Sequence, residues 1–440
     1  MQISSIQRDY FNSTVSEYRA YCRALSYVVM GSWTAVNHKK VKSVCSTVER
    51  LIHKTKHNPN PRHRYFDKRF PRFPSYLRRA AIEFVVGQVS SYQTRYNEWL
   101  VSSKKKRGKP PAFNPVAGCY PTLYKKEMFK IDEDYKLGGL CKAQVKVFDS
   151  KQWVWTTIKV IIPKVEKDSS YNRIRDGVMK SPSLIVKKGA AHLSVPFEIT
   201  TKPLSKGVVC AVDIGINTLA VASIVDADGT VLARKFMHPA KNIARRDHAL
   251  KQIQKKASLT KKLTKGFCSN LYRKAGYHND EIAYKTAKSI IDFALANGAS
   301  TIALENLKGF KPRGKGSRLK LKFHGWLHRK LALKVEERFQ EYGGKVFWVY
   351  ARGTSSHAFD GSGKLARNKD QYELATFKSG KQYNCDLSAS YNIGARAWVK
   401  ILGKKKKAES GNDSQGVQGK SSCTSSRIPT TLSTLWRKAA

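Results

Sequence analysis

The longest apolar stretch of the chain runs from Val208 to Ala222 and is interrupted by one acidic residue, Asp213. A run of small and β-branched residues predicts a strand that is buried on both faces. The segment 226–229 has the composition of a hairpin turn, and 231–236 predicts a returning strand. A carboxylate inside a buried strand is costly unless it is paired or binds a cation, so Asp213 is the first candidate functional residue.

Beyond this meander the pattern alternates between helices and strands. Helical periodicity predicts helices over 240–265, 279–297 and 326–342, and apolar runs predict strands over 300–307 and 345–350. Such an alternation is typical of a layered α/β domain.

Two further acids lie at the ends of these elements. Glu305 is near the end of the strand predicted over 300–307, and Asp386 lies in the first turn of a helix that begins at about residue 384. Each acid alone is weak evidence, because Asp386, for example, is also what the dipole of a helix N-terminus favours.

The first 200 residues have a different pattern. Apolar residues recur at helical spacing from about residue 13 to residue 100, and a cationic, proline-containing linker follows at 102–111. Several short strands between about 124 and 199 predict a small barrel or sandwich.

We therefore predict a multidomain α+β protein. The predicted boundaries are 1–105 for a helical region, 106–205 for a β-barrel domain, 206–402 for an α/β domain, and 403–440 for a disordered tail of Lys, Ser, Gly and Gln.

The net charge of the chain indicates what kind of molecule it binds. Lys and Arg number 82 against 32 Asp and Glu, which gives a formal net charge of +50. Such a balance favours a protein that binds a long polyanion, because neutralising phosphates releases counterions. The sequence contains no 18-residue apolar run and no amphipathic anchor, so we expect no membrane partner.

The cysteines and the N-terminus indicate the compartment. The eight cysteines form no Cys-x-x-Cys pair, which argues against a disulfide framework and against an intact zinc site. The first eight residues lack the apolar core of a signal peptide. We expect a cytoplasmic, nucleoid-associated protein of a bacterium or archaeon.

Cationic residues interleaved with aromatic ones suggest contacts with nucleic acid, through phosphate binding and base stacking. An ordinary solvated loop is an equally good interpretation of the segment 58–70. The residues that we expect to contact nucleic acid are Arg62, Arg64, Tyr65, Lys68, Arg69, Arg72, Tyr76, Arg78, Arg79, Arg245, Arg246, Lys311, Arg313, Lys315 and Arg318.

Taken together, the three acids suggest metal-dependent phosphodiester chemistry. Hard carboxylate oxygens suit Mg²⁺, and two such ions can clamp the attacking water and the leaving oxygen. RNase H-like nucleases begin their metal site with an acid in the first strand of a meander of this kind. We predict that Asp213, Glu305 and Asp386 are catalytic and hold two Mg²⁺ ions.

The contexts of these acids resemble the three split RuvC motifs of the TnpB family, which is related to the compact type V CRISPR nucleases. The matching segments are 212–217 (Val-Asp-Ile-Gly-Ile-Asn), 303–307 (Ala-Leu-Glu-Asn-Leu) and 385–393 (Cys-Asp-Leu-Ser-Ala-Ser-Tyr-Asn-Ile). The resemblance is specific over about 208–398 and rests on architecture alone upstream. It implies a recognition region, a wedge barrel and a RuvC-like nuclease, with Asn217, Asn306 and Asn392 in supporting roles.

By this resemblance the protein would be an RNA-guided DNA endonuclease. Its partners would be a structured guide RNA and a double-stranded DNA target, and it would recognise a short motif beside the target. A monomer and a homodimer both remain open. Two alternatives also remain: a guided repressor without cleavage, which the three intact acids disfavour, and a DDE-type transposase, which the late Asp386 and the lack of a helix-turn-helix disfavour.

The chain departs from the family in two places. Family members usually carry a four-cysteine zinc knuckle between the second and third motifs, whereas the matching segment 350–383 contains none of these cysteines. His357 and Asp360 without thiolates would make a poor structural zinc site, so we predict no zinc and an insert that is either held by packing or partly mobile. The opening strand of the family's barrel is also short or missing, since Met1–Ile6 offers little to form it.

Overall fold

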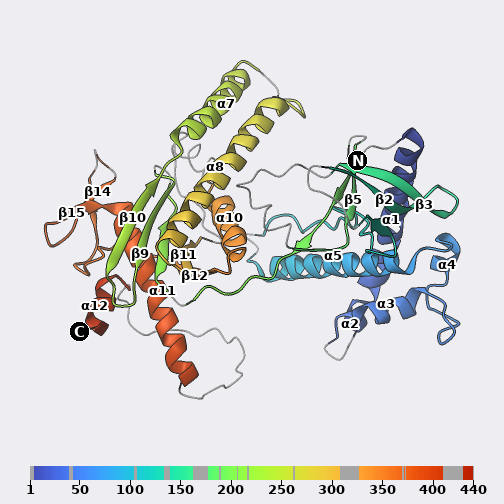
Figure 1. The fold of residues 1–440 in the computed structure, drawn as a ribbon, viewed down its shortest axis with the longest axis horizontal. Coiled ribbons are helices and arrows are strands. Elements are labelled where there is room, and N and C mark those ends of the chain that lie inside the picture. Colours follow the sequence, from blue (N-terminus) through green and yellow to red (C-terminus); the bar gives the residue numbers. More distant parts are fainter. Residues whose placement is uncertain are drawn as a thin grey trace. The chain divides into compact units, whose positions relative to one another are not determined.

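The computed structural model describes residues 4–38, 43–103, 107–132, 139–161, 177–187, 190–205, 207–215, 218–260, 263–307, 327–368, 371, 373–409 and 430–439 (Figure 1). The chain divides into two compact units, 1–200 and 201–440, which are described separately below.

The first unit begins with five helices. They are α1 (Ser5–Gly31), α2 (Trp33–Val36), α3 (Val44–Ile52), α4 (Tyr65–Arg69) and α5 (Ser75–Val101). α1 begins at a capping box, in which Ser4 and Gln7 satisfy each other's backbone N–H groups. The apolar residues of α1 that recur at helical spacing are buried, which confirms the helical periodicity predicted for this region.

Short strands follow these helices. They are β1 (Phe129–Ile131), β2 (Leu140–Phe148), β3 (Trp153–Ile161), β4 (Val178–Met179), β5 (Ser183–Lys187), β6 (Ala190–Ser194) and β7 (Phe197–Glu198). They form a three-stranded sheet in the order β1-β2-β3 and two separate pairs, β4-β7 and β5-β6.

The prediction of a barrel is wrong for the described residues, in which no closed barrel occurs. The physical reason lies in β2, whose residues alternate between buried and exposed. Its buried side chains, such as Val145 and Val147, join Phe11 and Val15 of α1 in one hydrophobic core. The strands therefore cover a helix instead of closing on one another.

The second unit is built on a five-stranded mixed sheet. Its strands are β8 (Val209–Asp213), β9 (Ala220–Val225), β10 (Val231–Met237), β11 (Thr301–Asn306) and β12 (Lys345–Tyr350), in the order β10-β9-β8-β11-β12. The first three strands form the antiparallel meander that the sequence predicts, and β11 lies parallel to both β8 and β12.

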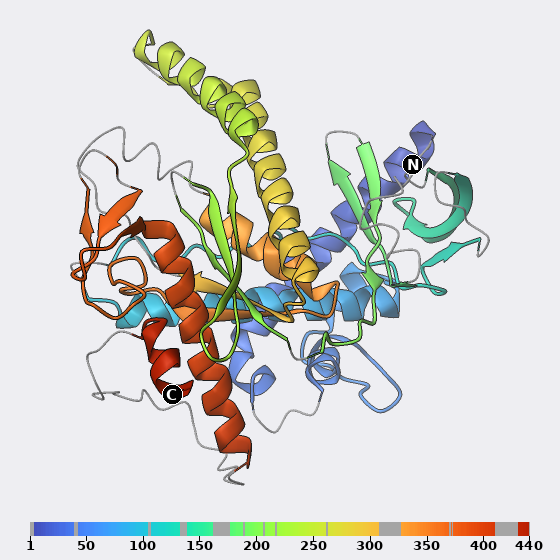
Figure 2. The ribbon, with the colours of Figure 1, turned by 60° about the vertical axis from the view of Figure 1, so that its left-hand side comes forward.

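Helices cover both faces of this sheet. α7 (Ala240–Ser258), α8 (Ser269–Ala296) and α10 (His328–Gln340) follow the predicted alternation, and α11 (Cys385–Glu409) is the last long helix. Because side chains alternate across a strand, Cys210 and Val212 of β8 pack with α8 and α10, whereas Val209 and Ala211 pack with α11. Figure 2 shows α11, in red, in front of the green strands, and α8, in yellow, behind them.

Gly394 is the point where α11 comes closest to the sheet. A Cβ atom added at Gly394 would lie 2.8 Å from Cγ2 of Val225 and 3.3 Å from Cβ of Ala211. Both neighbours are fully buried and cannot move aside freely. The absence of a side chain at this position therefore sets the spacing between helix and sheet.

We expect Gly394→Ala to lower the free energy of unfolding by about 1–2 kcal/mol, since overpacking outweighs the better helix propensity of alanine. Gly403→Ala is the matched control, because it lies in the same helix with open space around it, and should stabilise the protein slightly. Urea denaturation of both variants measures the difference. A Gly394→Ala protein as stable as Gly403→Ala would contradict this close packing.

The insert and the C-terminal segment complete the second unit. The insert contains a small sheet of β13 (Ala366–Arg367), β14 (Leu374–Thr376) and β15 (Gln382–Asn384). The C-terminal segment contains α12 (Ser433–Ala439).

The prediction of a disordered tail from residue 403 is wrong for the described part of that segment. α11 continues to Glu409, and Leu432 and Leu435 are each only 1 % exposed. Leu432 donates its backbone N–H to Oδ1 of Asn392 on α11. The short apolar sequence around α12 thus packs into the core. Composition alone does not predict this, because the residues before it are polar.

Candidate active site

Asp213 and Glu305 come from adjacent parallel strands at the same level of the sheet. In the register of β8 and β11, Ala303 faces Ala211 and Leu304 faces Val212, so Glu305 follows beside Asp213. Alternation along each strand puts both carboxylates on the face that carries Ala211 and Ala303, which is the face covered by α11. The two acids that lie far apart in the sequence are therefore neighbours in the sheet.

Asp386 reaches the same place from the start of α11. Oδ1 of Asn384 accepts hydrogen bonds from the backbone N–H groups of Asp386 (3.1 Å) and Leu387 (3.0 Å), which fixes the beginning of the helix. A Cβ atom added at Gly215, just after β8, would lie 3.6 Å from Oδ2 of Asp386. The end of β8 therefore lies within van der Waals reach of this carboxylate, whereas the same Cβ atom would clash with the Thr218 oxygen at 2.5 Å.

The electrostatics of the site show that both other carboxylates act on Asp213. Burial raises the pKa of Asp213 well above its usual value, and the negative charges of Glu305 and Asp386 raise it further. Burial also raises the pKa of Glu305 and that of Asp386. Three acids held together in a buried place carry negative charge that the surrounding protein only partly compensates.

Two arginines supply part of this compensation. The positive charge of Arg367, on β13, lowers the pKa of both Asp213 and Asp386. Arg396, on α11, lowers the pKa of Glu305, and its guanidinium donates to the backbone oxygens of Arg352 (3.1 Å) and Thr430 (3.2 Å). Arg367 thus connects the insert electrostatically to the acids of the main sheet.

Thr354 and Asn392 support the site from behind. The hydroxyl of buried Thr354 donates to Oε1 of Glu305. Nδ2 of Asn392 donates to the backbone oxygens of Thr354 (3.0 Å) and His357 (2.9 Å). Asn392, predicted from the sequence as a supporting residue, therefore holds the loop that carries Thr354 instead of pointing into the acids.

We expect Thr354→Val to raise the pKa of Glu305 further, because the hydroxyl that lowers it is lost while the shape is kept. Under the function proposed below, the acid limb of the pH–rate profile should move to higher pH. Thr286→Val is the matched control, since Thr286 is a buried threonine of α8 whose hydroxyl has no partner within the described residues. An identical shift of the acid limb in both variants would show that the Thr354 hydroxyl has no specific effect on Glu305.

The donor set suits a hard divalent cation. All three acids offer carboxylate oxygens, which Mg²⁺ prefers, and their raised pKa values mark a place where added positive charge would be stabilising. Among the described residues, however, no three His, Cys, Asp or Glu side chains stand close enough together to hold one ion as they are. The three carboxylates are neighbours, but they are not close enough together to bind one ion jointly.

The structure separates the predicted nucleic-acid contacts near α4 by exposure. Phe66, Phe70 and Phe73 turn inward and pack around Tyr21, so the aromatic residues of this segment form core. The candidates with exposed side chains here are Arg62, Arg64, Tyr65, Lys68, Arg69, Arg72 and Arg79, and Tyr76 is half-buried.

Arg78 must be removed from this set. It is 8 % exposed, and its Nε lies 3.4 Å from Oε1 of Glu49. Its position on the buried face of the first turn of α5 and its pairing with Glu49 favour a structural role for this arginine.

The remaining candidates belong to the second unit. On α7, Arg245 is exposed, whereas Arg246 is half-buried and paired with Asp247 at 2.8 Å. Asn306 follows Glu305 at the end of β11. Four predicted contacts and one predicted supporting residue lie outside the described residues: Lys311, Arg313, Lys315, Arg318 and Asn217.

Packing holds the insert, as predicted. Phe359 and Phe377 are buried in the same core as α11, with ring centroids 5.4 Å apart. His357 and Asp360 make local hydrogen bonds: Nδ1 of His357 lies 3.1 Å from the Gly353 oxygen, and Oδ1 of Asp360 accepts from the N–H of Ser362 at 2.9 Å. The absence of zinc stays a prediction.

Two residues of the site, Thr354 and Arg367, are not predicted from the sequence. Thr354 lies in a polar stretch that shows no periodicity, and Arg367 is one of 82 lysines and arginines. Only their positions in the fold distinguish them.

Comparisons with known proteins agree with this architecture. A family model described as the Aq_aa04 family matches residues 1–149. The chain is 30% identical over 158 residues to TnpB-like protein aq_aa05 of Aquifex aeolicus (strain VF5), an alignment that covers 34% of this chain and 52% of the relative. The chain therefore spans about half the length of the curated relative that it matches.

One solved structure of low sequence identity shares the fold, and a second matches more weakly. The protein in the structure of the Cas12f1–sgRNA–target DNA complex matches with a TM-score of 0.54 and 15% identity, over 88% of this chain and 82% of that chain. A Cas12i1 R-loop complex matches with a TM-score of 0.46 and 11% identity, over 89% of this chain and 66% of that chain.

The fold is thus that of a multidomain α/β protein resembling the type V CRISPR effectors. The curated relative is named a TnpB-like protein, and the Cas12f1 structure shares the fold. No helix among the described residues has the length and apolar character needed to cross a membrane.

Proposed function

We propose that this protein is an RNA-guided DNA endonuclease of the RuvC type. The observation that carries the proposal is the meeting of Asp213, Glu305 and Asp386, from three separate elements, on one face of the sheet. The net charge of +50 and the similarity to a TnpB-like protein support nucleic acid as the partner.

The chain's own residues divide the work in this proposal. Asp213, Glu305 and Asp386 would hold two Mg²⁺ ions, which supply an activated water and stabilise the leaving oxygen when bound. Thr354 and Arg396 both lower the pKa of Glu305 and so oppose the effect of burial, and Thr354 also positions this carboxylate through its hydrogen bond. Arg367, whose charge acts on two of the acids, is placed to attract the phosphate that is to be cut.

Guide RNA and target DNA would share the cationic surface. The exposed side chains around α4 are the proposed contacts to the flanking motif, and Arg245 of α7 is a proposed contact to the guided duplex. In guided recognition, base pairing with the guide RNA reads the DNA sequence, and the protein mainly contacts the sugar–phosphate backbone. A surface rich in lysine and arginine suits such contacts.

The test is to express the full chain with its native flanking DNA and to sequence the RNA that copurifies. We expect one discrete RNA with a constant folded part and a variable end, and Mg²⁺-dependent cleavage of DNA matched to that end. Chelation by EDTA should stop cleavage. A discrete RNA without cleavage would favour the guided repressor, and only heterogeneous cellular RNA would refute guidance.

A further inference from the structure

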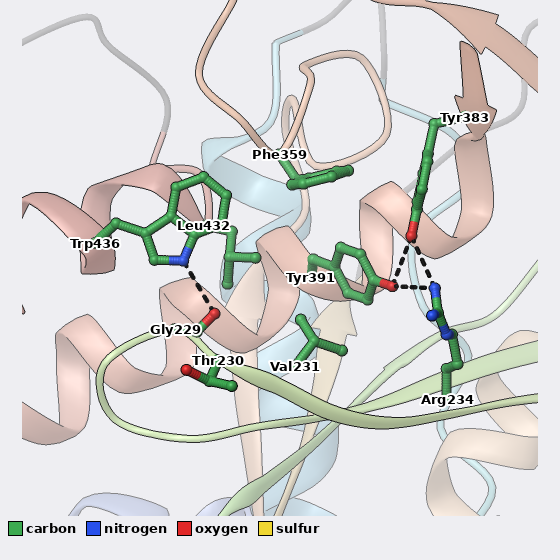
Figure 3. A pocket seen from close by; sticks show the side chains of 9 residues that line it. All are labelled: Gly229, Thr230, Val231, Arg234, Phe359, Tyr383, Tyr391, Leu432 and Trp436. Carbon is green, nitrogen blue, oxygen red and sulfur yellow. Dashed lines mark hydrogen bonds between the residues drawn. The ribbon is translucent and has the colours of Figure 1, made fainter. Parts of the chain in front are cut away.

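An aromatic pocket lies beside α11 and is distinct from the carboxylates. Its volume is about 290 Å³, and the strands β9–β10, the insert, α11 and the C-terminal segment all contribute to it (Figure 3). Sites for small ligands usually begin near about 300 Å³, so this pocket suits a single flat group and not a folded segment. The lining residues are Gly229, Thr230, Val231, Arg234, Phe359, Tyr383, Tyr391, Leu432 and Trp436.

Four aromatic rings form most of its wall. Phe359 stands at its centre, with ring centroids 5.0 Å from Tyr383, 5.2 Å from Tyr391 and 6.3 Å from Trp436, all in edge-to-face geometry. Figure 3 shows Trp436 and Tyr391 on two sides, Phe359 above them and Val231 below. The indole Nε1 of Trp436 donates to the Gly229 oxygen at 3.1 Å, which holds this ring at the rim.

The opening is cationic. Nη1 of Arg234 donates to the hydroxyl groups of Tyr383 (3.1 Å) and Tyr391 (3.5 Å), which fixes the guanidinium at the edge of the pocket while the side chain stays exposed. Nζ of Lys381 lies 5.2 Å from the ring centroids of both Phe359 and Tyr383. No lining residue is acidic. An aromatic wall with fixed positive charge at its mouth matches a base with its attached phosphate.

The register of the sheet puts the pocket on the same face as the candidate active site. Asp213 of β8 faces Val221 of β9, and Val221 faces Phe236 of β10. Arg234 is two residues from Phe236 and therefore points to the same side. Arg234 pairs with Ser223, and Ser223 pairs with Ala211, so Arg234 lies two strands from β8 and two residues before the level of Asp213. Because α11 covers the sheet between them, a strand bound by the exposed Arg234 would pass around this helix to reach the carboxylates.

We propose that this pocket binds one unstacked base of the single-stranded DNA substrate, while Arg234 binds a neighbouring phosphate. The inference rests on the proposed function, because it takes DNA as the substrate of this face. It adds a subsite that would hold the strand on the same face as the carboxylates. Base–aromatic stacking is tolerant of sequence, so the subsite would position DNA without reading it.

The test measures binding without cutting. A short single-stranded DNA that contains 2-aminopurine is titrated with the full chain carrying Asp213→Asn, and the quenching of its fluorescence is followed. We expect Trp436→Ala to weaken binding roughly 5- to 150-fold and to reduce the quenching. Arg234→Gln should lower the slope of log affinity against log salt by about 1.

Matched controls come from the chain itself. Lys235→Gln removes the same charge from the next residue of β10, on the opposite face, and Trp155→Ala removes a tryptophan of equal exposure, 41 % against 40 %, from β3. Trp436→Phe keeps an aromatic face and should retain most of the binding. The proposal would be refuted if Trp436→Ala and Arg234→Gln both bound DNA as the unaltered protein does. It would also be refuted if Trp436→Phe lost as much binding as Trp436→Ala.

Two further outcomes separate the pocket from the proposed function. If guided DNA is never cut but the pocket variants still lose DNA binding, the pocket stands and the nuclease fails. If guided DNA is cut and the pocket variants bind and cut normally, only the pocket fails. Tighter pocket-dependent binding of the same oligonucleotide made as RNA would overturn its assignment to the DNA strand.

Discussion

Asp213→Asn is expected to abolish DNA cleavage, with a loss of at least about 10³-fold, because an amide cannot replace a carboxylate that holds a divalent cation. The substitution keeps the shape of the side chain inside the buried end of β8. Cleavage of guide-matched DNA in Mg²⁺ measures the effect. Asp292→Asn, on α8 and outside the site, is the control that should cut like the unaltered protein.

The same substitution should stabilise the metal-free protein at neutral pH. The pKa of Asp213 is raised in the folded state, so the folded state binds a proton more readily than the unfolded chain. Stability that depends on this group is therefore lost as pH rises from the ordinary value of 3.8 toward the raised one. Asparagine carries no such charge, so the thermal midpoint should rise and its dependence on pH should weaken.

Two results would contradict this account of Asp213. If Asp213→Asn melted at a lower temperature than the unaltered protein without Mg²⁺, the buried carboxylate would not be electrostatically strained. If added Mg²⁺ stabilised both proteins equally, Asp213 would not be among the ligands.

Asn392→Ala is expected to lower the free energy of unfolding by about 3 kcal/mol or more. The side chain of Asn392 is fully buried and makes three hydrogen bonds, to the backbone of Thr354, His357 and Leu432. Removing it leaves three buried backbone groups without these partners, each at a cost of about 1–3 kcal/mol before relaxation. Urea denaturation measures the loss.

The control for this prediction is Asn297→Ala, which removes a single hydrogen bond to the Phe293 oxygen at the end of α8. Its cost should be about 1 kcal/mol. Limited proteolysis adds a local measurement, since Asn392→Ala should expose the segment 430–439 to cleavage before the sheet unfolds. Equal stability of the two variants would show that Asn392 does not hold this segment.

The sequence could predict the elements of the second unit because their patterns are strong. The buried run of β8 and the meander after it have few alternative structures, and Asp213 is conspicuous because a charge in such a run is costly. Glu305 and Asp386 are candidates because they lie at the end of a predicted strand and the start of a predicted helix, and their resemblance to known motifs strengthens them. Parallel pairing between β8 and β11 then follows from the fold, not from any local pattern.

Other parts could not be predicted, for identifiable reasons. Short alternating strands have the same pattern whether they close a barrel or cover a helix such as α1, so the pattern alone cannot distinguish the two arrangements. Leu432 and Leu435 are too few to stand out in a polar tail. Arg367 and Thr354 act at a distance in the sequence from the acids, where local spacing carries no information.

The order of the three acids along the chain has a consequence for folding during synthesis. The meander β8–β9–β10 is contiguous and can form on the ribosome while it holds only one of the acids, Asp213. Glu305 arrives with β11, and Asp386 only when α11 docks. The charge repulsion on Asp213 therefore builds in two steps, first when β11 brings Glu305 beside it and then when α11 brings Asp386.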